Sequence, residues 1–280
     1  MEQQFENVVK PRNGWFDIDV KEIFRYRDLI GLFVKRDFVS LYKQTILGPL
    51  WAVIQPFLTT VVFTVVFGNL AGLAADGCPS FLFYFSGTIV WQYFSTCLTQ
   101  TADTFVTNSS IMGKVYFPRL VMPISTVFTN LISFCIQFGM FILFFLYYLF
   151  IAKAIHPTFY MILLPLLVLQ MAMLGLGAGI IVSSLTTKYR DLRMLITFGV
   201  QLWMYGTPVA YDLAIIPQKL LPIYMINPMT QVVVAFRKGF LNVGTFDLKY
   251  YLIGWATTIC ILFIGVILFS RVEKTFMDTI

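Results

Sequence analysis

The long apolar stretches of the sequence hold almost no residue that could perform chemistry. Asp103 and Asp212 fall at the ends of such stretches, and the single histidine, His156, falls in a turn between two of them. Ionisable residues inside a membrane are costly and usually functional, so their scarcity argues against an intramembrane enzyme. It also argues against a carrier driven by protons or sodium, which usually needs a buried acid. The sequence has no zinc-protease, serine-hydrolase or paired-carboxylate pattern, and we predict neither a catalytic nor a metal site.

Nucleotide binding by this chain is not expected either. The sequence has no Walker-type phosphate loop, which is the usual way for a protein to bind ATP. The run Gly-Leu-Gly-Ala-Gly from Gly175 to Gly179 resembles part of a dinucleotide fingerprint, but it follows no strand and lacks the last glycine. Two glycines four residues apart in an apolar helix are typical of close helix packing. We predict that role for Gly175 and Gly179.

The composition is that of an integral membrane protein. Of the 280 residues, 58% are hydrophobic and only 12% are charged, whereas soluble proteins have about 25% charged residues. The sequence predicts an all-α fold with six transmembrane helices in a domain of 46–280, after a cytoplasmic segment of 1–45. The third apolar run is too long for one straight span, so we expect it to tilt or to project from the bilayer. The six runs, each near the ~20 residues that cross ~30 Å of hydrocarbon, are 46–70, 81–103, 120–151, 159–183, 194–214 and 250–270.

The distribution of positive charge predicts the orientation. Fifteen of the 20 Lys and Arg residues fall in 1–45 and in the other segments on the same side of the predicted topology, and five fall on the opposite side. By the positive-inside rule, both termini are expected in the cytoplasm. The net charge of +6 therefore reflects membrane topology, and no nucleic-acid partner is expected.

Residues 20–42 are predicted to form an amphipathic helix. Ile30 and Phe33 belong to a set of apolar residues at helical spacing, and Arg25 and Arg36 belong to the charged set on the other side. A basic helix with an aromatic apolar face suits the cytoplasmic surface of a membrane, where it also contacts lipid. Packing against the core of the same chain is the alternative.

Residues 215–249 are too polar and too irregular to form a full span. Four prolines between positions 208 and 228 interrupt this region, although much of it remains apolar. Irregular backbone at membrane depth needs protein or water to satisfy its polar groups. We predict two short re-entrant helices over 215–241 on the outer side, with their turn at Asn227-Pro228. An ordinary structured loop is the alternative.

Two segments on the cytoplasmic side look suited to a partner protein. Segment 104–119 offers helix-capping residues before a short predicted helix from Ile111 to Val115. Segment 188–193 places four charges within six residues. A solvated loop is the alternative for both.

Five motifs follow one another along the chain. Residues 36–56 contain Arg-Asp-Phe, Tyr-Lys-Gln-Thr, Leu-Gly, Leu-Trp and Gln-Pro in that order. The other four motifs are Phe117-Pro118-Arg119, Tyr189-Arg190-Asp191, Thr207-Pro208-Val209-Ala210-Tyr211, and Asn227-Pro228-Met229 with Arg237. In their order, their spacing and their six-span setting, the five motifs resemble those of the ABC-2-type permeases that export O-antigen, capsule and teichoic-acid polysaccharides. The resemblance extends from about residue 15 to 271.

The resemblance implies a homodimer of this chain joined to two copies of a separate P-loop ATPase. That partner would bind ATP and Mg²⁺, so no cofactor is expected in this chain. The resemblance also implies a multi-pass protein of the bacterial inner membrane and a lipid-linked polysaccharide as substrate, with O-antigen the expected one. An exporter of a small hydrophobic compound and a polytopic enzyme acting on a lipid-linked sugar are the alternatives.

The resemblance further implies roles for particular residues. The helix over 20–42 becomes an interface or gate helix, with Arg36, Asp37, Tyr42 and Lys43. The residues expected to couple to the ATPase are Ser110, Met112, Lys114, Tyr116, Arg190 and Asp191. The residues expected at the outer gate are Pro208, Asn227 and Pro228.

Aromatic side chains are the candidates for lining a sugar channel, because their rings can stack on sugar rings without a deep trap. The alternative for each is an ordinary lipid-facing or interfacial aromatic residue. The candidates are Trp51, Trp91, Tyr93, Trp203, Tyr205 and Tyr211.

Overall fold

The computed structural model of the chain describes residues 20–43, 47–74, 77–108, 111, 114–115, 117–186 and 192–276. Helices dominate this part of the chain, and no strand occurs in it. The α-helices are α1 (Val20–Arg25), α2 (Arg27–Tyr42), α3 (Trp51–Phe63), α4 (Ser80–Ala102), α5 (Thr104–Thr107), α7 (Val121–Leu146), α8 (Leu164–Thr186), α9 (Leu192–Tyr205), α10 (Leu221–Ile226), α11 (Pro228–Leu241) and α12 (Leu248–Phe276). Short 3-10 or π segments are η1 (Gly48–Leu50), η2 (Thr64–Leu70), η3 (Tyr147–Ile151), η4 (Phe159–Leu163) and η5 (Leu213–Ile215).

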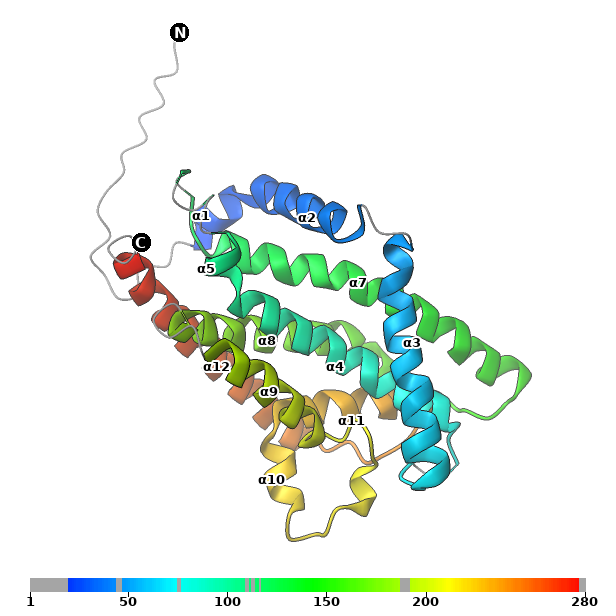
Figure 1. The fold of residues 1–280 in the computed structure, drawn as a ribbon. Helices are drawn as coiled ribbons and strands as arrows, with labels where there is room; N and C mark the ends of the chain where they lie inside the picture. Colours follow the sequence, from blue (N-terminus) through cyan, green and yellow to red (C-terminus); the bar gives the residue numbers. More distant parts are fainter. Residues whose placement is uncertain are drawn as a thin grey trace.

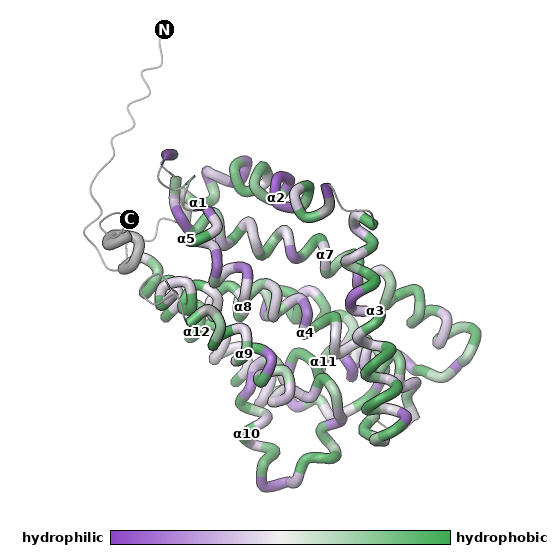
Figure 2. The backbone as a smooth tube through the Cα atoms, in the orientation of Figure 1, coloured by the Kyte–Doolittle hydropathy of each residue, from purple (hydrophilic) through white to green (hydrophobic). Residues whose placement is uncertain are grey.

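Within the described part of the chain, four helical segments are long and apolar enough to cross a membrane: Gly48–Leu70, Val121–Ile151, Phe159–Thr186 and Leu248–Ser270. They correspond to the first, third, fourth and sixth predicted runs. The second run is α4, whose 23 residues extend about 35 Å but include many Ser, Thr and Gln side chains. Figure 2 shows mostly hydrophobic residues along α3, α9 and α12, with hydrophilic residues near α1, α2 and α5. The prediction of an all-helical membrane protein is confirmed.

The expected fifth span of 194–214 is helical only as far as Tyr205. Turns follow, and Thr207 donates its backbone N–H to the carbonyl of Met204 at 3.1 Å. Pro208 explains the early end, because proline has no N–H to donate and disfavours the helical conformation of the residue before it. The 14 residues of α9 extend only about 21 Å, which is less than the ~30 Å of a bilayer core.

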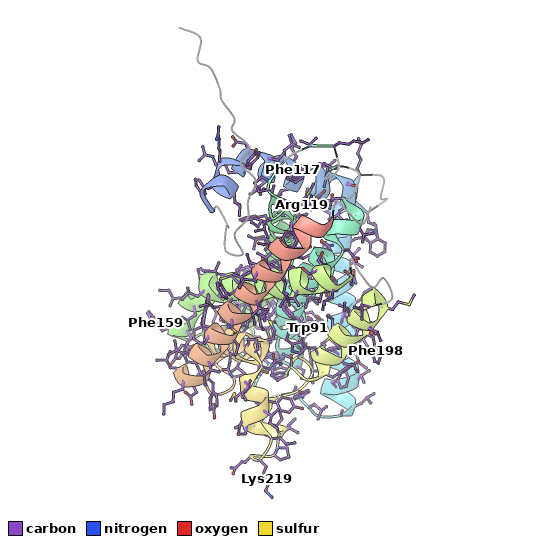
Figure 3. The ribbon with its side chains drawn as sticks, turned by 90° about the vertical axis from the view of Figure 1, so that its left-hand side faces the viewer. Trp91, Phe117, Arg119, Phe159, Phe198 and Lys219 are labelled. Atoms are coloured by element: carbon purple, nitrogen blue, oxygen red, sulfur yellow. The ribbon has the colours of Figure 1, made fainter. Side chains whose placement is uncertain are left out.

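The helices form one bundle around α4 (Figure 1). α4 packs between α7 and α8, α12 packs on the other side of α8, and α3 crosses both α4 and α7. Residues from Leu82 to Val90 in α4 are nearly all buried. In Figure 3, Phe117 and Arg119 lie at one end of the molecule and Lys219 at the other, whereas Phe159 and Phe198 lie on opposite sides.

The glycine-rich stretch of α8 allows this close packing. A Cβ atom added to Gly175 would lie 2.7 Å from Cβ of Cys97, and one added to Gly179 would lie 2.5 Å from Cβ of Thr101. Gly177 faces α12, where its added Cβ would lie 2.7 Å from Cα of Leu262. The predicted packing role of Gly175 and Gly179 is confirmed, and their partner is α4.

The predicted amphipathic helix is present as α1 and α2, which break only at Tyr26. One face of α2 packs on α7 and places Phe33 in a buried cluster with Phe117, at a ring distance of 5.7 Å. Leu32 and Val39 point outward and are exposed. The apolar face of the helix thus packs on the core of the chain, as in the alternative, and contact of the helix with the membrane surface stays a prediction.

The predicted pair of short helices in 215–241 is also present, as α10 and α11. The side chain of Asn227 accepts a hydrogen bond from the backbone N–H of Met229 at 3.1 Å, which caps α11, and Pro228 occupies its first position, where a missing N–H costs nothing. α11 is almost entirely buried against α4, α8 and α12. The turn at Asn227-Pro228 is thus confirmed.

Candidate functional site

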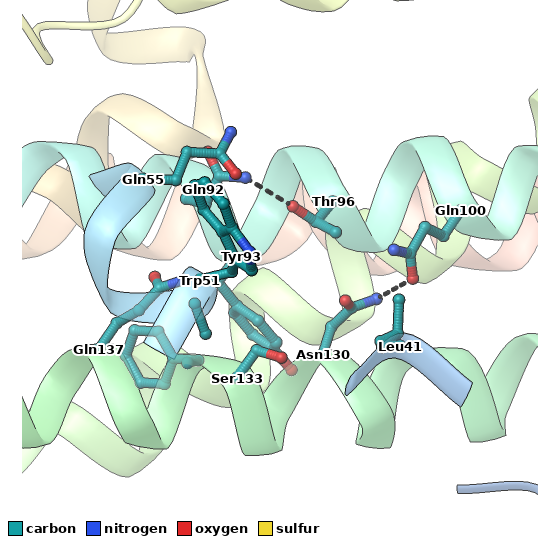
Figure 4. Close-up of a pocket in the computed structure, with 12 residues that line it drawn as sticks. Leu41, Trp51, Gln55, Gln92, Tyr93, Thr96, Gln100, Asn130, Ser133 and Gln137 are labelled. Atoms are coloured by element: carbon teal, nitrogen blue, oxygen red, sulfur yellow. Dashed lines mark hydrogen bonds between the residues drawn. The ribbon is translucent and has the colours of Figure 1, made fainter. Parts of the chain in front are cut away.

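A cavity of about 310 Å³ opens between the end of α2, α3, α4 and α7 (Figure 4). No charged side chain lines this cavity. Its wall includes the hydroxyl group of Thr96 and the aromatic side chains of Trp51 and Tyr93. Its volume is at the lower end of the roughly 300–1,000 Å³ of small-molecule sites. The amide side chains that line it are those of Gln55, Gln92, Gln100, Asn130 and Gln137.

Helical spacing brings these polar groups together. Gln92, Thr96 and Gln100 are four residues apart and form one ridge on α4. Asn130 and Gln137 belong to the facing ridge on α7. Asn130 joins the ridges, because its Nδ2 donates to Oε1 of Gln100 at 2.9 Å and to the carbonyl of Thr126 at 3.0 Å. Within α4, Nε2 of Gln92 donates to Oγ1 of Thr96 at 3.1 Å.

A second cavity of about 280 Å³ shares Leu41 and Gln100 with the first and continues toward α5. Its wall includes Arg36, Asp37 and Asp103. We call the two cavities together the polar groove. It extends from an uncharged part among α3, α4 and α7 to a charged end beside α2 and α5.

The charged end of the polar groove ties α2 to α5. Nη2 of Arg36 lies 2.7 Å from Oδ1 of Asp37 and donates to Oδ1 of Asn108 at 3.1 Å. The guanidinium also lies 4.8 Å from the ring centre of Phe33. Asn108 ends α5 and donates its Nδ2 to the carbonyl of Thr104 at 3.2 Å. The predicted interface helix therefore contacts the start of the segment that was predicted to meet a partner.

Two side chains at the uncharged part of the polar groove have a polar atom without a hydrogen-bond partner among the described residues. These atoms are the hydroxyl oxygen of Tyr93 and Oε1 of Gln137. Tyr93 is 2% exposed and Gln137 is 6% exposed. A buried polar atom without a partner is costly, by about 1–3 kcal/mol. Neither oxygen has appreciable accessible surface, so both lie within the packing of α4 and α7 and are not open to the groove.

The structure separates the six predicted channel aromatics. Trp51 and Tyr93 both line the polar groove. Trp91 is only 5% exposed, and its ring lies 6.4 Å from that of Trp203, so it packs in the core of this chain. Trp203 donates its Nε1–H to Oδ1 of Asn227 at 3.2 Å and thereby links α9 to the turn before α11. Tyr205 is exposed.

Tyr211 and the predicted gate residues lie together near the turn at Asn227-Pro228. The hydroxyl of Tyr211 donates to the carbonyl of Tyr205 at 2.8 Å, and Nδ2 of Asn227 donates to Oγ1 of Thr207 at 2.9 Å. The carbonyl of Pro208 accepts a hydrogen bond from Arg237 at 2.6 Å. The bonds from Asn227 and Arg237 hold the turn after α9 against α11.

Most predicted coupling residues lie outside the described residues. These are Ser110, Met112, Tyr116, Arg190 and Asp191. The side chain of Tyr42, which was predicted for the interface helix, also lies outside the described part. Lys114 is exposed, as is Lys43 at the end of α2. The backbone N–H groups of Lys114 and Val115 donate to the carbonyl of Ile111 at 3.1 and 3.2 Å.

Sequence reasoning missed two features. The first is the polar groove, although its signal was present in the four-residue spacing of Gln92, Thr96 and Gln100 within an apolar run. The second is Arg237, which was named with the Asn227-Pro228-Met229 motif but given no role of its own. It is 4% exposed, and an arginine amid the apolar residues of a short helix was the signal for its burial.

The fold and the groove define a multi-pass helical membrane protein with an uncharged polar path among its helices. The chain belongs to the ABC-2 type transporter family, whose model matches residues 28–241. It is 28% identical over 251 residues to an O-antigen export system permease protein RfbA of Klebsiella pneumoniae, which covers 90% of this chain and 94% of that protein. It is 26% identical over 264 residues to the protein of the same name from Myxococcus xanthus, and the match covers 93% of this chain and 98% of that protein.

Proposed function

We propose that this chain is the transmembrane subunit of an ATP-driven exporter that moves a lipid-linked O-antigen polysaccharide out of the cytoplasm. Family membership supports a transport role, and the printed names of the relatives support this cargo. The observation that carries the proposal is the chemistry of the polar groove, which offers amides, hydroxyls and aromatic rings, with no charge in its inner part.

This chemistry suits a neutral sugar chain. An amide side chain both donates and accepts hydrogen bonds, as a sugar hydroxyl does. Aromatic rings contribute apolar faces on which sugar rings can stack. A path without fixed charges holds each unit weakly, so a long polymer can pass from one set of contacts to the next.

The proposed assembly is a homodimer of this chain with two copies of a P-loop ATPase that binds ATP and Mg²⁺. Both termini would lie in the cytoplasm, and the complex would lie in the bacterial inner membrane. α9 supports this assembly, since it packs on α4 and α8 and leaves Met194, Leu195 and Phe198 exposed. A second copy and lipid would cover these apolar side chains.

The proposed mechanism transmits the ATPase motion through the segment 107–116. Closure of the two ATPases on ATP would move this segment, and the hydrogen bond from Arg36 to Asn108 would pass the movement to α2. α2 packs on α7, and α7 forms one wall of the polar groove. Movement at the cytoplasmic face would therefore change the width of the groove.

Changing Arg36 to Gln is expected to slow export about fivefold while ATP hydrolysis continues, because it removes the bond to Asn108 that joins the two elements. The measurement is the rate of glycan export per ATP hydrolysed by the purified complex. The control is Arg27→Gln on the same helix, where Arg27 is exposed and lies 3.8 Å from Asp28. Equal export by the two variants would contradict the proposed route.

Cells that lack this chain test the cargo. They are expected to lose the polysaccharide from the surface and to accumulate its lipid-linked form on the cytoplasmic side of the inner membrane. The measurement combines surface labelling with extraction of the lipid-linked glycan. Normal surface polysaccharide together with a new sensitivity to small hydrophobic compounds would instead favour an exporter of such compounds.

A further inference from the structure

We infer that an apolar cavity between α3, the start of α4 and the end of α7 with η3 binds one acyl chain of a membrane phospholipid, whose phosphate lies beside Lys153. The cavity has a volume of about 570 Å³ and shares no residue with the polar groove. The inference assigns a second site with a different ligand, so it holds whatever the cargo of the groove is. The side chains that line the cavity are those of Phe57, Phe81, Leu143, Phe144, Tyr147 and Tyr148.

The wall of this cavity is built from aromatic rings that support one another. The ring centre of Phe81 lies 4.9 Å from that of Phe144 and 5.8 Å from that of Phe57, so rings from three helices meet there. No charged side chain lines the cavity, and the only polar side-chain groups in its wall are two tyrosine hydroxyls. A bound water molecule needs roughly two to four polar partners. An apolar ligand therefore fits this wall better than water does.

The cavity lies within segments that are long and apolar enough to cross a membrane. Phe57 belongs to Gly48–Leu70, and the lining residues of α7 and η3 belong to Val121–Ile151. The cavity opens at the surface of the chain, because Leu143 is 70% exposed and Tyr147 is 51% exposed. The medium around a membrane span is hydrocarbon, so a hydrocarbon chain has direct access to the opening.

Lys153 follows the cavity at the end of the same span. The backbone N–H of Ala152 donates to the carbonyl of Tyr147 at 3.2 Å, and that of Ala154 donates to the carbonyl of Tyr148 at 3.0 Å. These two bonds fold the residues on either side of Lys153 back onto the tyrosine pair, and Lys153 itself has a left-handed φ of 48°. Lys153 is exposed and has no carboxylate within 4.0 Å in the described part of the chain. A free ammonium thus lies beside the mouth of the cavity.

Tyrosine and lysine at the end of a span are typical of the lipid headgroup region. The rings lie at headgroup level there, and the ammonium extends to the polar surface. An ammonium donates charge-assisted hydrogen bonds to phosphate oxygens. A phospholipid carries both groups that this place fits, which are an acyl chain for the cavity and a phosphate for Lys153.

The hydrocarbon tail of the proposed cargo fits this cavity less well. Gln55 lines the polar groove and Phe57 lines the apolar cavity, and two positions along a helix are about 200° apart around its axis. α3 therefore stands between the two cavities, so a cargo with its glycan in the groove would have to pass its tail around α3. Bilayer phospholipids also surround the opening at all times, and mass action favours them.

The test is native mass spectrometry of the full-length chain, released from detergent together with the lipids that it retains. The delipidated chain is titrated with phosphatidylglycerol to obtain a Kd for the first lipid bound. The site variants are Lys153→Gln, which removes the ammonium, and Leu143→Trp, which narrows the opening. Their matched controls are Lys219→Gln at another exposed lysine and Leu146→Trp at an exposed leucine of the same helix that does not line the cavity. Thermal unfolding of each variant checks that it is folded.

Each site variant is expected to weaken phosphatidylglycerol binding about fivefold, and the controls are expected to bind as the wild type does. Glycerophosphoglycerol, which is the same headgroup without acyl chains, is expected not to compete. The inference is overturned if site and control variants bind alike, or if the headgroup alone competes. It is also overturned if a polyprenyl phosphate binds this site more tightly than phosphatidylglycerol, which would assign the cavity to the tail of the cargo. A Leu143→Trp chain that loses a self-associated form but keeps its lipid would overturn it in favour of a second copy.

Discussion

Replacing Arg237 with Met is expected to destabilise the folded chain by at least about 3 kcal/mol, which is the cost of leaving several buried carbonyls without a donor. The guanidinium donates to the carbonyls of Pro208 at 2.6 Å and Val209 at 2.7 Å. It also donates to the carbonyl of Phe83 at 3.3 Å and lies 3.6 Å from the ring centre of that residue. Arg237 thus fastens the turn after α9 to α4.

The surroundings of Arg237 are shaped for this side chain. A Cβ atom added to Gly87 would lie 2.7 Å from Nη2 of Arg237, so glycine leaves the room that the guanidinium fills. Lysine is not expected to substitute, because a single ammonium cannot reproduce the planar fork of donors. Arg237→Lys should therefore also be destabilising, though less than Arg237→Met.

The measurement is the midpoint of thermal unfolding in detergent, followed by size-exclusion chromatography. Lys238→Met is the control on the same helix, because Lys238 is only half-buried and its side chain donates to Asn242 at 2.9 Å, at the end of α11. We expect the control to unfold like the wild type and both Arg237 variants to unfold at lower temperature. If the Arg237→Met chain unfolded at the wild-type temperature, the hydrogen bonds of Arg237 would not contribute to the stability of the fold.

Replacing Gly179 with Leu is expected to separate α8 from α4 and to cost about 3 kcal/mol or more, because the bundle has no room for the side chain. An added Cβ would already lie 2.5 Å from Cβ of Thr101 and 2.9 Å from the backbone oxygen of Leu98. The backbone of α4 cannot retreat without disturbing the core on its other side, since α4 also packs on α7 and α3. The amount of folded chain recovered from membranes should fall severalfold.

The matched control is Gly139→Leu. Gly139 lies in α7, and an added Cβ would meet no atom within 4 Å. We expect this variant to accumulate and to unfold as the wild type does. Equal yields of the two leucine variants would contradict the tight α4–α8 packing. The comparison removes the general effect of placing leucine in a membrane helix.

The sequence predicted most of the helical elements of this fold. Apolar length predicted the long helices, and helical periodicity predicted the helix over 20–42. Local chemistry predicted the turn at Asn227-Pro228, because a capping residue before proline marks a helix start wherever it occurs. The same rules applied to Pro208 would have ended α9 earlier than the apolar pattern suggested.

The candidate site was harder to predict from the sequence, because it depends on which helix faces pack against one another. Trp51 and Trp91 look alike in the sequence, yet one lines the groove and the other packs beside Trp203. Ionisable and aromatic side chains were the candidates in the sequence, and the amides Gln100 and Asn130 were not among them. Their importance follows from the hydrogen bond between them, which joins two helices. The two residues are 30 positions apart in the sequence, so no local pattern predicts this contact.

The direct test of the central proposal is ATP-dependent transport by the reconstituted complex. The chain and its P-loop ATPase are placed together in lipid vesicles with a lipid-linked O-antigen polysaccharide, and the glycan that reaches the opposite leaflet is measured. The account predicts transport that needs ATP, Mg²⁺ and both proteins. A folded chain that binds no ATPase, or a glycan that crosses equally well without ATP, would contradict it.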